Sequence, residues 1–199
     1  MSLLDTTGTP IPLGTLADVA APADFEPPPQ IDIPRSPQHS DAWCYAACAE
    51  MVISRCTPER FVDQCEVAGF VKETDCCFAD DPNCTDSGCQ EEQISEIFDK
   101  FGIAFQPEGQ VDLSVLSQEI EATPGRPVEI LVEWNSAPGE NSAHTLLITG
   151  VIGNRVFVVD PLGDGDFFYY GGWQDFDFVR NGFGQGAWVL TWVGLKRKV

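Results

Sequence analysis

Residues 38–53 have the sequence QHSDAWCYAACAEMVI and predict a buried helix with a cysteine near its beginning. No Gly or Pro interrupts the stretch from Asp41 onwards, and its Ala-rich, apolar pattern is typical of a helix inside a protein. Ser40 or Asp41 is expected to cap the N-terminus of this helix. Cys44 then lies in the first turn, where unpaired N–H groups and the positive end of the helix dipole favour a thiolate. The apolar positions are Trp43, Ala46, Ala47, Met51 and Ile53.

The rest of the chain is predicted to be helical first and β-rich afterwards. Thr57 and Pro58 are typical of a helix cap and a first helical residue, so a second helix is expected to begin there. After Pro124, short runs of β-branched and aromatic residues are separated by Gly, Pro and Asn, which predicts strands. This order favours an α+β fold, in which an antiparallel sheet packs against an N-terminal helical layer. The predicted helices are 57–69, 90–101 and 112–122, and the predicted strands are 128–134, 144–152, 156–160, 167–170 and 187–194.

Residues 1–35 are expected to form an extended, Pro-rich arm that precedes a single domain at 36–199. Eight of the 15 prolines lie before residue 40, and proline fixes φ and removes a backbone donor. The domain divides into a helical half at 36–123, with a cysteine-rich loop at 56–89, and a β-sheet half at 124–199. The arm is either a leader or linker, or a strap across the domain anchored by Leu13, Leu16, Phe25, Ile31 and Ile33.

The composition limits the classes of function. The chain has 199 residues and a formal net charge of −20, from 31 acidic and 11 basic side chains. Proteins bind nucleic acids and anionic lipids through clusters of Lys and Arg, which 11 scattered basic residues do not supply. Neither is therefore an expected partner. No apolar run is long enough for a transmembrane helix, and 2 histidines are too few for a His-rich metal site. A monomer without a metal or cofactor is expected.

A base for the Cys44 thiolate must come from one of the two histidines. His39 lies in the loop that enters the first helix, and it is the alternative base. His144 begins the strand HTLLITGVI, and the strand that follows ends at Asp160. A thiol, an imidazole and a carboxylate that meet in space form a nucleophile, a base and a group that orients the base.

The register of the hairpin between these strands decides whether His144 and Asp160 can meet. A two-residue loop at Gly153 and Asn154 with regular pairing places the two side chains on opposite faces. An odd loop or one bulge shifts the pairing by one residue and makes them diagonal neighbours, with Cα atoms about 7–8 Å apart on one face. We therefore expect an odd loop or a β-bulge in this hairpin.

These residues together resemble a known family. Gln38, WCYAA around Cys44, AHTLLITGV with His144 and VVDPLG with Asp160 occur in the order of the papain-like cysteine peptidases. The resemblance covers about Gln38 to Pro161. Within the family, the sequence most resembles the bacterial branch that includes bacteriocin-exporter peptidase domains and pathogen effector proteases. It implies a papain-like α+β fold, in which a substrate cleft separates a helical half with the cysteine from a β-sheet half with the histidine.

The resemblance also implies a role for each residue. Cys44 would be the nucleophile, His144 the general base and acid, and Asp160 the residue that orients His144. Gln38 would donate its side-chain N–H to the oxyanion, with the Cys44 backbone N–H as the second donor. The implied activity is that of a cysteine endopeptidase, which cleaves peptide bonds through an acyl-enzyme intermediate. The residues assigned to substrate binding are Trp43, Tyr45, which stands where papain itself has Trp, and Ala143.

Two other functions are compatible with the same residues. A toxin-like deamidase or transglutaminase would use the triad on a Gln side chain and release ammonia without cleaving the backbone. A disulfide-stapled binding module would keep the triad only as a vestige, with Cys44 as a small buried hydrophobe in an Ala-rich helix. Ammonia release and the reactivity of Cys44 distinguish these possibilities.

Six of the 8 cysteines cluster between residues 56 and 89, whereas Cys48 lies one helical turn after Cys44 and is expected to be buried or bridged. The six could form up to three disulfides or supply four thiolates to zinc. Disulfides are favoured because there is no CxxC pair, and they indicate an oxidising compartment. Since no signal peptide is recognisable, export by a non-classical route or a leader upstream is expected. The six disulfide candidates are Cys56, Cys65, Cys76, Cys77, Cys84 and Cys89.

Acidic side chains concentrate beside the predicted nucleophile. Between Glu59 and Asp99 there are twelve Asp and Glu residues against Arg60 and Lys72. Such a pattern is usual for a solvated surface, but it also attracts positively charged ligands. A protein or peptide substrate, basic in character, is therefore the expected partner.

Overall fold

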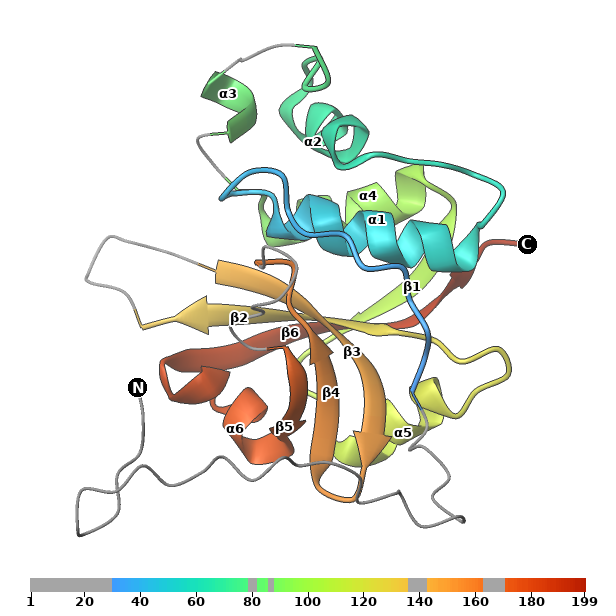
Figure 1. The fold of residues 1–199 in the computed structure, drawn as a ribbon, viewed down its shortest axis with the longest axis vertical. Coiled ribbons are helices and arrows are strands. Elements are labelled where there is room, and N and C mark those ends of the chain that lie inside the picture. The colour runs from blue at the N-terminus through green and yellow to red at the C-terminus, as the bar shows by residue number, and fades with distance from the viewer. Residues whose placement is uncertain (1–29, 79–81, 86–87, 136–142, 163–170) are drawn as a thin grey trace, which may run out of the picture.

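An antiparallel sheet of six strands is the centre of the part of the chain that the computed structural model describes, residues 30–78, 82–85, 88–135, 143–162 and 171–199 (Figure 1). The strand order is β1-β6-β2-β3-β4-β5, so the last strand in the chain lies between β1 and β2. The strands are β1 (Ile103–Glu108), β2 (Val128–Trp134), β3 (Ala143–Ile152), β4 (Arg155–Val159), β5 (Gly172–Asp175) and β6 (Gly186–Arg197).

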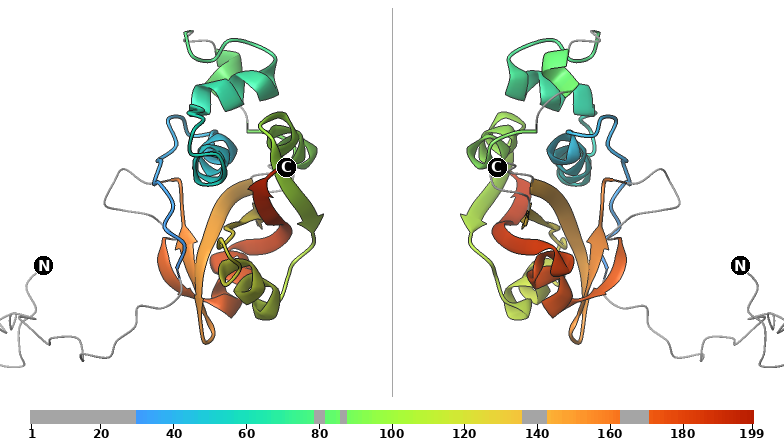
Figure 2. Two further views of the ribbon diagram at one scale, coloured as in Figure 1. Left: turned by 90° about the vertical axis from the view of Figure 1, so that its right-hand side faces the viewer. Right: turned by 90° about the vertical axis from the view of Figure 1, so that its left-hand side faces the viewer.

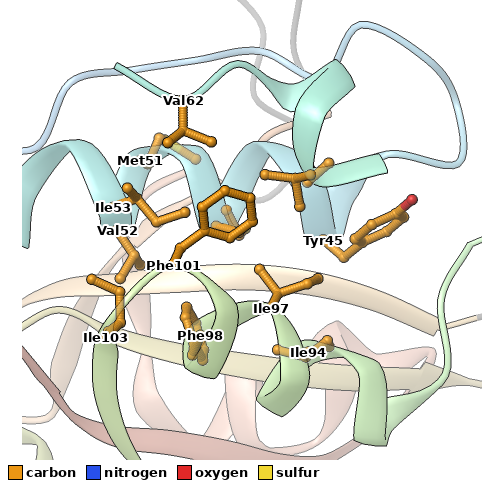
Figure 3. Close-up of a cluster of buried hydrophobic side chains, with 14 of the residues drawn as sticks. Tyr45, Met51, Val52, Ile53, Val62, Ile94, Ile97, Phe98, Phe101 and Ile103 are labelled. Carbon is orange, nitrogen blue, oxygen red and sulfur yellow. The ribbon is translucent and has the colours of Figure 1, made fainter. Parts of the chain in front are cut away.

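Helices cover both faces of this sheet (Figures 1 and 2). On one face, Ile53 of α1 and Ile97 and Phe98 of α4 belong to a buried apolar cluster (Figure 3) that includes Leu147 and Trp192 of the sheet. On the other face, α5 and α6 pack on a second cluster of strand residues. The predicted α+β architecture, with an antiparallel sheet, is confirmed. None of the described helices is long and apolar enough to cross a membrane. The helices are α1 (Cys44–Cys56), α2 (Gln64–Lys72), α3 (Pro82–Thr85), α4 (Glu91–Lys100), α5 (Leu113–Ile120), α6 (Phe176–Arg180) and the 3₁₀ helix η1 (Gly182–Gly184).

Helix α1 begins at Cys44 itself. Its N-cap residue is Trp43, and no side chain of the described residues caps it. The prediction that Ser40 or Asp41 caps this helix is therefore wrong. Residues 39–42 form a turn in which the Ser40 carbonyl accepts the Trp43 N–H at 3.0 Å, and this turn keeps both side chains away from the cap position. Cys44 consequently lies closer to the helix end than the sequence predicts.

The second helix begins later than predicted. Thr57 ends α1, because its N–H and its hydroxyl both donate to the Ile53 carbonyl, at 2.7 and 2.8 Å. Helix α2 begins at Gln64, where the Asp63 side chain caps it by accepting the Cys65 N–H at 3.0 Å. Thr57 thus marks the end of α1, and the prediction that the second helix begins at Thr57 is wrong.

The other helices and strands largely follow the prediction. β1, β5 and α6 are additions that the sequence patterns did not indicate. β1 contains Pro107, which cannot donate a ladder hydrogen bond, and it lies at one edge of the sheet, where this loss is tolerated. The strand predicted at 167–170 lies outside the described residues. The confirmed predictions are 90–101 (α4), 112–122 (α5), 128–134 (β2), 144–152 (β3), 156–160 (β4) and 187–194 (β6).

The predicted β-bulge is present in the β3–β4 hairpin. The connecting loop has two residues, but the register of pairing shifts between Ile148 and Gly150, so Thr149 is the extra residue. Because of this shift, His144 and Asp160 project from the same face of the sheet, as diagonal neighbours. The bulge therefore brings the histidine and the carboxylate together.

The end of the N-terminal arm lies on the domain. Residues 31–38 have no regular secondary structure, but Ile31 and Ile33 are buried in the two apolar clusters. The Ile31 N–H donates to the carbonyl of the bulge residue Thr149 at 2.7 Å. Two of the proposed anchors thus contact the domain, and the remaining three, Leu13, Leu16 and Phe25, lie outside the described residues.

Two disulfides connect α2 with the loop and short helix that follow it. Cys65 is bonded to Cys77, and Cys76 to Cys84, so the adjacent Cys76 and Cys77 have different partners. These four sulfurs are therefore not available as zinc thiolates. Cys56 and Cys89 are free thiols, so their assignment as disulfide candidates is wrong. Cys48 is a buried free thiol, one of the two states expected for it. Cys56 ends α1, with its sulfur 3.7 Å from the Leu195 carbonyl of β6, and Cys89 lines a cleft.

Candidate active site

Cys44 is held at the N-terminal end of α1, and only 9% of its surface is exposed. Helical hydrogen bonding starts with the Ala47 N–H, which donates to the Trp43 carbonyl at 3.0 Å. The N–H groups of Cys44 and the two residues after it therefore have no acceptor within the helix. These groups and the helix dipole favour negative charge at this position.

His144 and Asp160 form a buried hydrogen bond. The His144 Nε2 and Asp160 Oδ1 atoms are 2.8 Å apart, and the exposed fractions of the two residues are 7% and 0%. Asp160 Oδ1 also accepts the Leu162 backbone N–H at 2.8 Å, which fixes the carboxylate. His144 is thus the histidine that meets the carboxylate, whereas His39, the alternative base, is exposed.

The imidazole of His144 also contacts Cys44. Because Nε2 is used by Asp160, Nδ1 is the nitrogen that faces the sulfur. Burial alone would raise the pKa of Cys44, but the hydrogen bond and positive charge of His144 outweigh burial and lower it. Burial alone would lower the pKa of His144, but its bonds to Asp160 and Cys44 raise it to about 9. The shifts of the two pKa values both favour the thiolate–imidazolium pair over the neutral thiol and imidazole.

The other free thiols have the opposite tendency. Burial raises the pKa of Cys48 well above the usual range and raises that of Cys56 to about 11. Burial and then the nearby Cys44 charge raise the pKa of Cys89 as well. Cys44 is therefore the free cysteine whose environment favours the reactive form.

Trp134, at the end of β2, stacks on His144. The ring centroids are 6.3 Å apart and the planes are inclined by 25°. The indole therefore lies over one face of the imidazole. The sequence predicted the strand that ends at Trp134, but it gave no signal that this indole would lie on the histidine.

A cleft with a volume of about 1210 Å³ lies beside Cys44 and His144. Tyr45 and Ala143, two residues assigned to substrate binding, are among its lining residues. Trp43 is not: it is buried, and its indole N–H donates to the Cys84 carbonyl at 2.5 Å. The side chain of Trp43 thus joins the disulfide-bonded region to the start of α1, and its role in substrate binding stays a prediction.

Gln38 lies in the loop before α1 and connects the two halves of the domain. Its backbone N–H donates to the carbonyl of Pro161, the residue after Asp160, at 2.9 Å. Its side-chain Nε2 donates to the carbonyls of Ser40 and Asp41 at 2.8 and 2.9 Å. Oε1 is buried without a hydrogen-bond partner among the described residues. The amide is thus close to α1, with both N–H groups bonded to the entering turn.

The described residues contain no cluster of three or more His, Cys, Asp or Glu side chains arranged to hold a metal ion. A thiolate at a helix N-terminus, a histidine beside it and a carboxylate behind the histidine can perform nucleophilic attack with proton transfer.

This combination of helix and sheet is the papain-like fold. A helix begins at the cysteine, and an antiparallel sheet carries the histidine and the carboxylate. The model of the Peptidase_C39 like family matches residues 30–179, and the chain belongs to this family. The predicted resemblance to the bacterial branch of the papain-like peptidases is confirmed.

Solved structures of C39 peptidase domains have the same fold. The peptidase domain of Streptococcus ComA, a bi-functional ABC transporter involved in quorum sensing, is 12% identical, with a TM-score of 0.52 over 79% of this chain and 96% of that one. A protein from Bacillus anthracis described as C39-like peptidase is 15% identical, with a TM-score of 0.55 over 84% and 96%. A double glycine motif protease from an AMS/PCAT transporter, in complex with the leader peptide, is 14% identical, with a TM-score of 0.51 over 85% and 94%. A search of curated proteins gave no match.

The raised pKa of His144 leads to a prediction about its titration. In the wild type the imidazole is expected to lose its proton near pH 9. Asp160→Asn removes the carboxylate that favours the imidazolium, so the midpoint moves to lower pH; Cys44→Ala acts in the same direction. The measurement is the chemical shift of the His144 Cε1–H group against pH by NMR, with the exposed His39 as the reference signal. Identical midpoints in the wild type and Asp160→Asn would contradict this electrostatic description.

Proposed function

We propose that this protein is a cysteine peptidase that cleaves peptide bonds with Cys44, His144 and Asp160. The observation that carries the proposal is the buried 2.8 Å hydrogen bond between His144 and Asp160, beside a thiol whose pKa is lowered by the same histidine. A surface cysteine or a structural histidine does not require this combination of burial, pairing and pKa shift.

The reaction begins with the thiolate of Cys44. Its sulfur attacks the carbonyl carbon of the substrate, and the oxyanion that forms is stabilised by the Cys44 backbone N–H. Gln38 turns its amide from the carbonyls of Ser40 and Asp41 to supply the second N–H. The imidazolium of His144 then protonates the leaving amine, and the acyl group remains on the sulfur.

Hydrolysis of the thioester completes the cycle. Neutral His144 takes a proton from water, which attacks the acyl carbon, and the thiolate of Cys44 leaves. Asp160 keeps its hydrogen bond to His144 and stabilises the imidazolium in both halves of the cycle. The C39 relative that was solved with a leader peptide supports a peptide chain as the substrate of this protein.

Removal of the sulfur tests this mechanism. Cys44→Ala is expected to lower kcat for peptide hydrolysis by about 10⁴-fold or more, because the residues of a triad act as a unit. Cys56→Ala, at the other end of the same helix, is the matched control and is expected to keep wild-type activity. The measurement is cleavage of a diverse peptide library, with mass analysis of the products.

The same experiment separates the alternatives. Ammonia release from Gln side chains without backbone cleavage would establish a deamidase instead of a peptidase. Equal behaviour of the wild type and Cys44→Ala in every assay would favour a binding module.

The cleft is also expected to select basic substrates. Asp41, Glu91 and Glu133 are among its lining residues, whereas Lys72 is the one Lys or Arg among the described lining residues. Lys72 Nζ also donates to the Gly88 carbonyl at 2.6 Å, which directs its charge to the backbone. A substrate with Lys or Arg near the scissile bond therefore meets a favourable potential.

Glu91→Gln and Glu133→Gln test this preference one charge at a time. Each is expected to lower kcat/KM for a Lys-containing peptide by about fivefold at low salt. This loss is equivalent to about 1 kcal/mol, the interaction energy of two opposite charges in the dielectric of water. The loss should diminish at high salt, because ions screen exposed charges. Glu66→Gln, an exposed residue of α2 outside the cleft lining, is the control. Unchanged selectivity between Lys- and Glu-containing peptides in both cleft variants would refute the preference.

The two disulfides support the proposal that the protein acts in a compartment outside a reducing cytosol. Disulfides persist in oxidising compartments and are rare where thiols are kept reduced. Cys77 is exposed, so the Cys65–Cys77 bond is open to cellular reductants. Eight free thiols in protein purified without reductant would contradict this placement.

A further inference from the structure

Gln64 bonds to several parts of the loop that carries Gln38. It is the first residue of α2, and its exposed fraction is 0%. Its amide Nε2 lies 2.8 Å from Ser36 Oγ and 2.9 Å from the Pro37 carbonyl. Its Oε1 accepts the backbone N–H of His39 at 2.9 Å. The residues on both sides of Gln38 are thus bonded to one buried side chain.

The same amide joins this loop to α1. Gln64 Nε2 is also 2.9 Å from Glu50 Oε2, and the Ser36 hydroxyl donates to that oxygen at 2.5 Å. The loop is therefore attached to the helix that carries Cys44 through a network with Gln64 at its centre. The network is partly buried, and at its centre the loss of these bonds would leave the fully buried Gln64 amide unpaired, which favours a rigid loop.

The position of Gln64 is itself fixed by the disulfide-bonded region. Cys65, the next residue, is bonded to Cys77, and the Asp63 side chain caps the start of the helix at Cys65. The N-terminal turn of α2 is therefore cross-linked to the loop beyond its C-terminus. This explains why a short region outside the sheet and the catalytic residues is stabilised covalently.

We propose that Gln64 is a positioning residue for Gln38. By bonding to Pro37 and His39, it sets the backbone from which the Gln38 amide reaches the oxyanion, and the Cys65–Cys77 disulfide holds Gln64 in place. The proposal rests on the proposed peptidase function, since positioning matters only where Gln38 contacts the reacting atoms. Gln64 itself does not contact the substrate.

A double-mutant cycle tests this role. Gln38→Ala removes an oxyanion donor and is expected to lower kcat about 10²-fold. Gln64→Met keeps the length of the side chain but removes its hydrogen bonds, and is expected to lower kcat about 10-fold with little change in KM. Because both act through one donor, the double variant is expected to equal Gln38→Ala alone. Additive losses, or an unchanged kcat in Gln64→Met, would overturn the proposal.

Hydrogen exchange supplies a readout that does not need activity. In Gln64→Met, the amides of residues 36–41 are expected to exchange about 10-fold faster, while those of β3 and β4 keep their wild-type rates. Gln110→Met is the control, because the Gln110 amide bonds to the Arg180 and Trp188 carbonyls in the β-sheet half. Unchanged exchange at residues 36–41 would overturn the proposal, even if the wild type cleaves peptides.

The two proposals fail in different ways. A wild type that cleaves no peptide would refute the proposed function, whereas the exchange measurement would still decide whether Gln64 fixes the loop. A global rise in exchange in Gln64→Met would show a role in general stability and would also overturn the specific role. Reduction of Cys65–Cys77 in the wild type is expected to reproduce the local increase at residues 36–41.

Discussion

The hydrogen bond between His144 Nε2 and Asp160 Oδ1 is the interaction on which the proposed site depends. It exists because the bulge at Thr149 places both side chains on one face of the sheet. It leaves Nδ1 directed at Cys44, and the resulting charges lower the pKa of the thiol and raise that of the imidazole. The start of α1 and the indole of Trp134 complete this environment, one with unpaired N–H groups and the other with an apolar cover.

Much of this arrangement could be predicted from the sequence, because it depends on local patterns. The Ala-rich stretch after Asp41 predicts a helix with Cys44 in its first turn, and runs of β-branched and aromatic residues predict β2, β3, β4 and β6. The bulge is one of the two arrangements, with an odd loop as the other, that strand parity requires if His144 and Asp160 share a face. The order of helices and strands was sufficient to predict the α+β architecture.

What could not be predicted depends on contacts between segments that are distant in sequence. The stacking of Trp134 on His144 and the burial of Trp43 against the Cys84 carbonyl arise only when the halves pack together. The cysteine pairing could not be derived, because six cysteines allow fifteen connectivities and two of them remain unpaired. Thr57 misled the helix assignment because a hydroxyl can bond to the end of one helix as readily as it caps the next.

Brief alkylation with iodoacetamide at pH 6, followed by peptide mapping, tests the central claim most directly. The claim is that the environment of Cys44 makes it the one thiolate among the free cysteines. The predicted result is a single label on Cys44 and a loss of peptide hydrolysis in proportion to it, while Cys56, whose pKa is about 11, remains unmodified. Labelling of Cys56 or Cys89 before Cys44, or full activity in protein labelled at Cys44, would contradict the claim.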